Sequence, residues 1–368
     1  MKWPGGIYVH VPFCVTRCGY CDFNAYAGMG HLAVRYVPAL AREADLAAPD
    51  WDGRIFSTVF FGGGTPTTLP VAELVNVLDY LRQRMEIVSE AEVTIEANPD
   101  TVDAVAFESL LAGGFTRLSM GAQSFDPAVL AALERVHDPG AVRRAFAAAR
   151  AAGHANVNLD LIYGAHGETL VSWRRTLEEA IALGPEHLSA YALTIEPATS
   201  LGRAVASNAV PPPDPDLQAE MYDIACVMLR AAGYRHYEIS NWARPGFECG
   251  HNLLYWRRGD YLGIGAGAHS HRDGRRWWNL RPPTSYLAAV EGGRPPTAGE
   301  EILSPTDRRF EEVFLGLRTT EGIPWDEVDQ DRAGTFVSEG LMERHDGRLV
   351  PTERGWFLAN DLACALVG

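Results

Sequence analysis

The sequence predicts an α/β fold in which parallel strands, each followed by a helix, form one open sheet. Strand-like apolar runs alternate with amphipathic helical stretches through the first two hundred residues, and several of these stretches end in glycine, as helices often do. Polar motifs follow the ends of the predicted strands, where such folds hold their ligands. Repeated strand–helix units imply right-handed crossovers between parallel strands. An open partial barrel and a doubly wound sheet both satisfy this pattern.

Six strands are expected in this part of the chain, from short apolar runs rich in β-branched and aromatic residues. They cover residues 6–11, 57–63, 92–98, 117–123, 156–164 and 187–197. A loop with three cysteines follows the first strand, and the sequence GGGTPT follows the second. Glu96 ends the third strand, Gln123 ends the fourth, and Asp160 lies within the fifth. These motifs are therefore expected to meet at one edge of the sheet.

The pattern changes after the sixth strand. Residues 205–215 are rich in Pro and Asp and predict a linker or a long loop. A helix and several aromatic, β-prone segments follow, including HNLLYW at 251–256. From about residue 300, helical stretches with a hairpin resemble a winged helix. The sequence thus predicts a barrel domain at 1–204, a linker with an α+β extension at 205–298, and a small helical domain at 299–368.

Composition and charge exclude several classes of protein. The 368 residues are 47% hydrophobic and 21% charged, with a net charge of −15 and a pI near 5.2. This acidic balance argues against a nucleic-acid partner and against an anionic membrane surface. No apolar run approaches the ~18–20 residues of a membrane-spanning helix, and no signal-peptide core is visible. Six cysteines, three of them crowded together, do not form a disulfide pattern, so a cytoplasmic location is expected.

Three cysteines stand within eight residues near the start of the chain. Cys14, Cys18 and Cys21 have the spacing C-x3-C-x2-C, and no fourth cysteine stands nearby. Structural zinc sites and ordinary ferredoxin clusters usually have four protein ligands. The spacing therefore predicts a metal centre with one open position, with a zinc knuckle or a group of buried cysteines as the alternative. Cys226, Cys249 and Cys364 lie too far apart to form a second such site, and Cys226 and Cys364 are expected in the core.

The cysteine loop, with Tyr20 just before its third cysteine, resembles that of the radical S-adenosylmethionine (SAM) superfamily. This resemblance implies a partial (β/α)6 barrel in which three thiolates hold a [4Fe-4S] cluster. It also implies that the amino and carboxylate groups of SAM ligate the fourth iron. The open position is then the place of the cosubstrate.

Further motifs are similar to those of the coproporphyrinogen-dehydrogenase-like branch of this superfamily. By that resemblance, the residues that bind SAM are Tyr8, Gly63, Gly64, Thr65, Glu96, Gln123, Arg135 and Asp160. The residue types suit these roles. Arg135 offers a fork for the methionine carboxylate, Glu96 suits the ammonium group, and Asp160 and Gln123 suit ribose hydroxyls.

The chain departs from the true oxygen-independent oxidases of this branch. Those proteins carry a further cysteine two positions after the third ligand, where this sequence has Phe23, and a longer segment ahead of the cluster. HNLLYW instead matches the HNxxYW motif of their heme-binding relatives. The resemblance implies a protein that binds heme and passes it to an acceptor protein, with membrane contact only through that acceptor.

The heme ligand is expected to be His251, with Tyr255 and Trp256 against the macrocycle and Arg257 and Arg258 for its carboxylates. Cys249, His269 and His271 are competing ligands, and a packed aromatic hairpin is the simpler interpretation of the motif.

Three functions therefore stay open. The first is a heme chaperone with a SAM-ligated cluster. The second is a coproporphyrinogen III dehydrogenase that uses a 5′-deoxyadenosyl radical. The third is a structural metalloprotein without SAM. Phe23 and HNLLYW favour the first.

Overall fold

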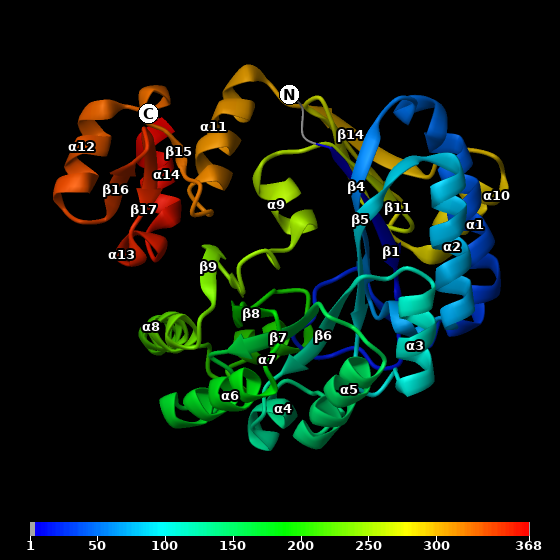
Figure 1. Cartoon of the computed structure of the whole chain (residues 1–368), viewed down its shortest axis with the longest axis horizontal. Coiled ribbons are helices and arrows are strands. Elements are labelled where there is room, and N and C mark those ends of the chain that lie inside the picture. Colours follow the sequence, from blue (N-terminus) through cyan, green and yellow to red (C-terminus); the bar gives the residue numbers. More distant parts are fainter. Residues whose placement is uncertain (1–3, 368) are drawn as a thin grey trace.

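The computed structural model describes residues 4–367 and centres on one twelve-stranded sheet (Figure 1). Its strand order is β14-β13-β12-β11-β1-β4-β5-β6-β7-β8-β10-β9. The six parallel strands at its centre follow chain order: β1 (Gly5–Val11), β4 (Ile55–Gly63), β5 (Glu86–Ala97), β6 (Arg117–Gln123), β7 (Val157–Tyr163) and β8 (His187–Ala192). Because this order never reverses, the doubly wound alternative is excluded and the partial barrel is confirmed.

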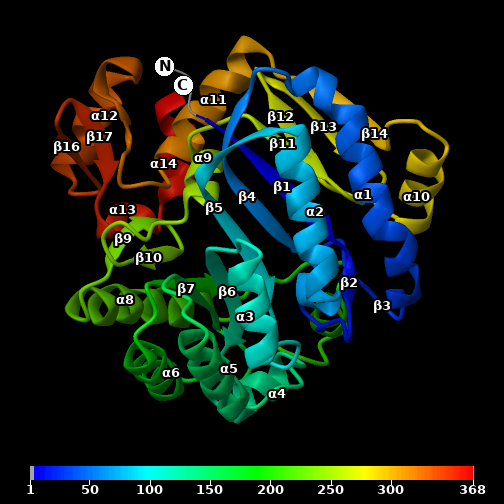
Figure 2. The same cartoon turned by 45° about the vertical axis from the view of Figure 1, so that its right-hand side comes forward.

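Helices cover the outer face of this sheet (Figure 2). They are α1 (Ala33–Ala47), α2 (Val71–Arg84), α3 (Ala104–Ala112), α4 (Pro127–Ala132), α5 (Pro139–Ala151) and α6 (Leu170–Leu183). The parallel strands are buried on both faces and pack with these helices into one large apolar core. A short helix, α7 (Ser200–Ala206), and a long one, α8 (Pro215–Ala231), follow β8.

The sheet continues beyond the barrel on both sides. On one side β11 (Tyr261–Ile264) pairs parallel with β1, and β12 (His269–Arg272), β13 (Arg275–Asn279) and β14 (Thr297–Ile302) add antiparallel strands. Helix α10 (Pro283–Glu291) connects the last two. On the other side β10 (Asn241–Ala243) and β9 (Arg235–Glu238) are antiparallel. The barrel therefore stays open, with a curved inner face.

The segment HNLLYW is helical, so the expected β-prone hairpin is wrong here. It forms α9 (Gly250–Trp256), which lies on the inner side of the curved sheet in Figure 1. The Glu92 carboxylate on β5 accepts hydrogen bonds from the backbone N–H groups of Gly250 (3.1 Å) and His251 (3.2 Å) at the start of this helix. His251 and Leu254, three residues apart, are its buried side chains. A tertiary contact to the first turn thus overrides the local β preference of the aromatic residues.

A small domain with its own apolar core completes the described chain. It contains α11 (Pro305–Gly316), β15 (Ile323–Pro324), α12 (Gln330–Ser338), the hairpin β16 (Met342–His345) and β17 (Arg348–Pro351), α13 (Glu353–Trp356) and α14 (Ala359–Val367). Helices packed on a short three-stranded sheet agree with the winged-helix-like expectation. The predicted limits at 204/205 and 298/299 fall inside α7 and β14 and stay predictions. Within residues 4–367, no helix combines the length and apolarity needed to cross a membrane.

Candidate functional site

The cysteine loop is fixed at its two ends by a pair of very short parallel strands. β2 (Phe13–Cys14) pairs with β3 (Tyr26–Ala27), and the Tyr26 N–H donates to the carbonyl oxygen of Pro12 (2.7 Å). Between these ends the loop lies open, and all three of its cysteines are half-exposed free thiols. Such exposure leaves the sulfur atoms able to reach an external group.

The three cysteines share one cavity of about 420 Å³ with most of the predicted SAM residues. Its lining includes Cys14, Cys18, Cys21, Gly63, Gly64, Thr65, Glu96, Gln123, Arg135 and Asp160. The side chains come from the ends of the first five barrel strands and the loops that follow them, as the sequence predicted. Tyr8 and His251 do not line this cavity; Tyr8 lines a neighbouring one.

Arg135 connects the cysteine loop with the strand ends. It lies in the connection between α4 and α5, each of which begins at an aspartate that caps its first turn, Asp126 and Asp138. Its guanidinium donates to the side-chain oxygen of Asn98 (2.7 Å), and lies 3.5 Å from the sulfur of Cys18. A positive charge here offsets the negative charge that three thiolates would carry.

The glycines after β4 allow the backbone to approach the loop closely. Gly63 has a φ of +115°, and a Cβ atom there would lie 2.4 Å from the ring of His10. A Cβ at Gly64 would lie 2.6 Å from the carbonyl oxygen of Phe13. Both positions therefore require glycine, and the space that a side chain would fill stays open beside the cavity.

Two of the carboxyl groups in the wall of this cavity, those of Glu96 and Asp160, come from barrel strands and have no cationic partner within ion-pair distance among the described residues. Burial and then the nearby charge of Asp160 raise the pKa of Glu96 to about 7, although Glu96 accepts a hydrogen bond from the Gly63 N–H (3.1 Å). Burial also raises the pKa of Asp160, which accepts hydrogen bonds from Ser119 (3.0 Å) and Asn158 (2.9 Å). A bound cation would favour the ionised form of Glu96.

A second, larger cavity of about 900 Å³ adjoins the first on the inner side of the sheet. Four residues line both cavities: Phe23, Gly63, Glu96 and Tyr191. The walls of the larger cavity are rich in aromatic side chains, including Tyr255 and Trp256 of α9 and Trp278 of β13. A concave, aromatic space with a few polar groups is typical of a binding site for a large planar ligand.

His251 does not line either cavity. It is 1% exposed, and its two ring nitrogens have partners in Thr58 (Nδ1 to Oγ1, 2.8 Å) and Tyr255 (Nε2 to Oη, 2.8 Å). Burial and the charge of Arg117 lower its pKa to about 3, so it is neutral. In this conformation its contacts are those of a packed core histidine, and its role as a heme ligand stays a prediction.

The other residues that the sequence analysis named near HNLLYW also have contacts inside the protein. Arg257 forms an ion pair with Glu321, and Arg258 pairs with Glu312 (2.5 Å). Cys249 is buried, with its sulfur 3.6 Å from Glu92. Of the two cysteines expected in the core, Cys226 is buried, whereas Cys364 is exposed on α14, so that expectation is wrong for Cys364.

Sequence reasoning missed several side chains of the two cavities. Asn98 bridges Arg135 and Thr65, to which its amide donates (3.0 Å), and it stands in the same EANP motif as Glu96. Arg281 lines the larger cavity, together with His269, which the sequence analysis already named as a competing ligand. No local pattern marks Arg281, because it reaches the cavity only through the folding of the β11–β14 extension onto the barrel.

The residues of the smaller cavity fit a [4Fe-4S] cluster with SAM. Three thiols on an open loop supply soft ligands, Arg135 supplies a compensating charge, and the glycines leave room for a ligand along the strand ends. Within residues 4–367, no three His, Cys, Asp or Glu side chains converge tightly enough to hold a single metal ion.

Comparison with known proteins shows the family of this chain. The model of the radical SAM superfamily matches residues 8–180, and that of the HemN C-terminal domain matches residues 303–358. Heme chaperone HemW of Mycobacterium tuberculosis is 42% identical over 371 residues, covering 99% of this chain and 95% of that protein. Heme chaperone HemW of Escherichia coli is 39% identical, covering 87% and 84%.

A solved structure with the same architecture is that of E. coli coproporphyrinogen III oxidase (HemN), described as a radical SAM enzyme. It superimposes with a TM-score of 0.85 at 25% identity, covering 99% of this chain and 90% of that one. Fold and site thus define a radical SAM protein of the HemN-like branch. Within that superfamily, the chain belongs to the HemW family.

Proposed function

We propose that this protein binds heme and delivers it to an acceptor protein, and that Cys14, Cys18 and Cys21 hold a SAM-ligated [4Fe-4S] cluster. The observation that carries the proposal is the pair of adjoining cavities. One contains the cysteines and the SAM-type motifs, and the other is large, aromatic and next to it. The family relatives named as heme chaperones support the choice of heme for the larger cavity.

The residues of the smaller cavity would bind and orient SAM through complementary charge. In this proposal Arg135 binds the carboxylate of the methionine group, Glu96 its ammonium group, and Asp160 and Gln123 the ribose hydroxyls; all four line the same cavity. When bound, the reduced cluster and SAM supply one-electron chemistry. The chain itself contributes the charges and the enclosed strand-end pocket.

A dehydrogenase acting on coproporphyrinogen III is the second candidate. Four residues line both cavities, so a tetrapyrrole in the larger one would lie beside SAM in the smaller one, as radical chemistry on a propionate requires. Phe23 is the feature that separates the candidates, since it is a 65% exposed phenylalanine where the oxidases have a further cysteine.

One experiment distinguishes the two functions. The cluster is reconstituted without oxygen, and the protein is then given ferric heme or coproporphyrinogen III in separate reactions with SAM and a reductant. Heme chaperone function predicts stable heme uptake, transfer to an apo heme protein, and no decarboxylated porphyrinogen. Decarboxylated product without heme uptake would establish the dehydrogenase instead.

A further inference from the structure

Three histidines line the larger cavity, and a fourth, His251, lies behind its wall. They differ in whether the protein already occupies their ring nitrogens. His10 is bound at both nitrogens, to the Tyr8 hydroxyl (3.0 Å) and to the carbonyl oxygen of Asn24 (3.0 Å). His271 is likewise bound, to the carbonyl oxygen of Gly259 (3.0 Å) and the N–H of Gly274 (3.2 Å). His251, behind the wall, has both nitrogens occupied as described above.

His269 is the exception. It lines the cavity from the start of β12, and its imidazole has no hydrogen-bond partner among residues 4–367. The ring stacks on Trp278 at a centroid distance of 5.9 Å and an interplanar angle of 26°. Burial and then the charges of Arg281 and Arg276 lower its pKa, so the imidazole is neutral near pH 7 and keeps a free lone pair. A neutral, unbound imidazole is what an iron atom requires as an axial ligand.

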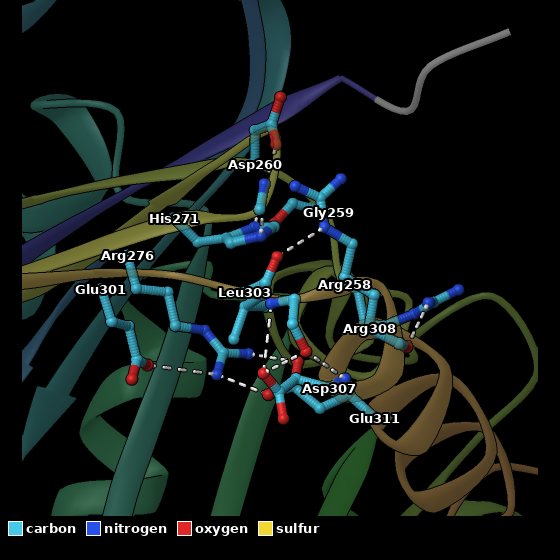
Figure 3. Close-up of polar contacts among 12 residues, drawn as sticks. Arg258, Gly259, Asp260, His271, Arg276, Glu301, Leu303, Asp307, Arg308 and Glu311 are labelled. Carbon is cyan, nitrogen blue, oxygen red and sulfur yellow. Dashed lines mark hydrogen bonds and ion pairs between the residues drawn. The ribbon is translucent and has the colours of Figure 1, made fainter.

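Arg276 and Arg281, which both belong to the β11–β14 segment, differ in whether the protein already pairs their charge. Arg276 forms a two-pronged ion pair with Glu311 (2.6 Å for each nitrogen) and lies 3.7 Å from Glu301. Figure 3 shows this guanidinium held between the two carboxylates, so its charge is already balanced. Arg281 also lines the cavity, but in the described part of the chain its guanidinium forms no ion pair or hydrogen bond.

The position of Arg281 is fixed through its backbone by the segment that follows the cysteine loop. Its carbonyl oxygen accepts hydrogen bonds from the side-chain amide of Asn24 (3.0 Å) and the hydroxyl of Tyr26 (3.3 Å). The backbone of Arg281 is therefore held beside the segment that follows the cysteine loop, and its side chain lines the larger cavity, which shares Phe23 with the smaller one. A single unpaired cation at the edge of an aromatic cavity suits a carboxylate of an otherwise apolar ligand.

We infer that His269 is the protein ligand to the heme iron and that Arg281 binds a heme propionate. This inference rests on the proposed heme-binding function and replaces His251, the ligand that the sequence predicts. It joins two exposed polar side chains of one aromatic cavity, neither of which has a hydrogen-bond or ion-pair partner among residues 4–367. His251 then acts as a positioning residue, because its ring holds the hydroxyl of Tyr255, which lines the cavity.

The test uses full-length protein titrated with ferric heme and, separately, with metal-free protoporphyrin IX. His269→Ala should shift the Soret band and increase the rate of heme loss to a heme-scavenging apoprotein by about tenfold or more, while protoporphyrin affinity stays within about twofold. Arg281→Gln should weaken both ligands by about tenfold, the worth of a charge-assisted contact, and Arg281→Lys should restore part of the affinity. His345→Ala, a 74% exposed histidine of the C-terminal domain, is the matched control and should change neither ligand.

The variants also separate failure of the ligand assignment from failure of the proposed function. A Soret band that is unchanged in His269→Ala but shifted in His251→Ala would return the ligand to the HNLLYW motif and overturn the inference, while leaving heme binding intact. Wild-type protein that takes up neither heme nor protoporphyrin would overturn the proposed function and the inference with it. Equal loss of heme and protoporphyrin in His269→Ala would show that the residue shapes the cavity and does not ligate iron.

Discussion

The cysteine cavity and the surroundings of His251 lie near each other, but the cysteines and the histidine differ in exposure and in how fully the protein occupies their bonding positions. The three cysteines are half-exposed on an open loop. His251, also part of a recognisable motif, is 1% exposed with both nitrogens hydrogen-bonded. An imidazole nitrogen has a single bonding position, so a histidine with both nitrogens occupied must break an internal hydrogen bond to bind a ligand, which yields little net free energy. The first region is therefore built to bind, and the second to hold α9 in place.

Removal of a loop cysteine should have the largest effect of the substitutions in these two regions, because it should abolish cluster binding. Cys14→Ala, Cys18→Ala or Cys21→Ala should each abolish the cluster, seen as loss of iron, sulfide and visible charge-transfer absorption after reconstitution. The free energy of unfolding of the protein without cluster should change by less than about 1 kcal/mol, because the thiols are half-exposed. A full iron and sulfide complement in all three variants would refute the cluster assignment.

Measuring SAM affinity as a function of pH tests the role of Glu96 in the same cavity. Glu96 has a pKa of about 7 in the free protein, raised mainly by burial, and the SAM ammonium would favour its ionised form. Affinity should therefore fall as the pH drops below about 7, by up to tenfold per pH unit, and level off above pH 8. Calorimetry on reconstituted protein from pH 6 to 8.5 measures this.

Two substitutions serve as controls for that measurement. Glu96→Gln should weaken binding by about tenfold at pH 8 and remove the pH dependence. Arg135→Ala should weaken binding to a similar degree but keep the dependence. An identical pH profile in wild type and Glu96→Gln would mean that another group carries the titration.

His251→Ala tests the opposite region and should show mainly as lost stability. The change leaves the Thr58 hydroxyl and the Tyr255 hydroxyl without their partner inside the protein, which costs about 1–3 kcal/mol of unfolding free energy. Urea denaturation of the protein without cluster or heme measures it, with His345→Ala expected to lie within about 0.5 kcal/mol of wild type. A stability equal to wild type would contradict the view that His251 is a structural residue of α9.

The smallest effect is expected at a cysteine outside the loop. Cys364 is exposed on α14, far along the chain from the other thiols, and Cys364→Ser should change unfolding free energy by no more than about 0.5 kcal/mol. Its iron content after reconstitution should equal that of wild type. A drop in iron in this variant would show that the loop is not the sole source of thiolate ligands.

The sequence by itself determined the repeated strand–helix core with parallel strands and the convergence of its motifs. Six regular strand–helix repeats allow few topologies, and parallel strands necessarily bring their carboxyl ends to one edge, so Cys14, Glu96 and Asp160 meet without any knowledge of side-chain contacts. The same periodicity could not decide between barrel and doubly wound sheet, since strand order is a property of pairing and not of local pattern.

Only the tertiary structure decided the state of each histidine. HNLLYW is rich in residues that favour strands, but Glu92, 159 residues before His251 in the chain, binds the first turn and makes the segment a helix. That helix turns His251 toward Thr58 and into the core. His269 and Arg281 line the same cavity because β11 pairs with β1 and adds the antiparallel strands β12–β14 to the edge of the barrel sheet. Which polar groups remain free to bind depends on contacts between segments distant in sequence, and no local pattern records them.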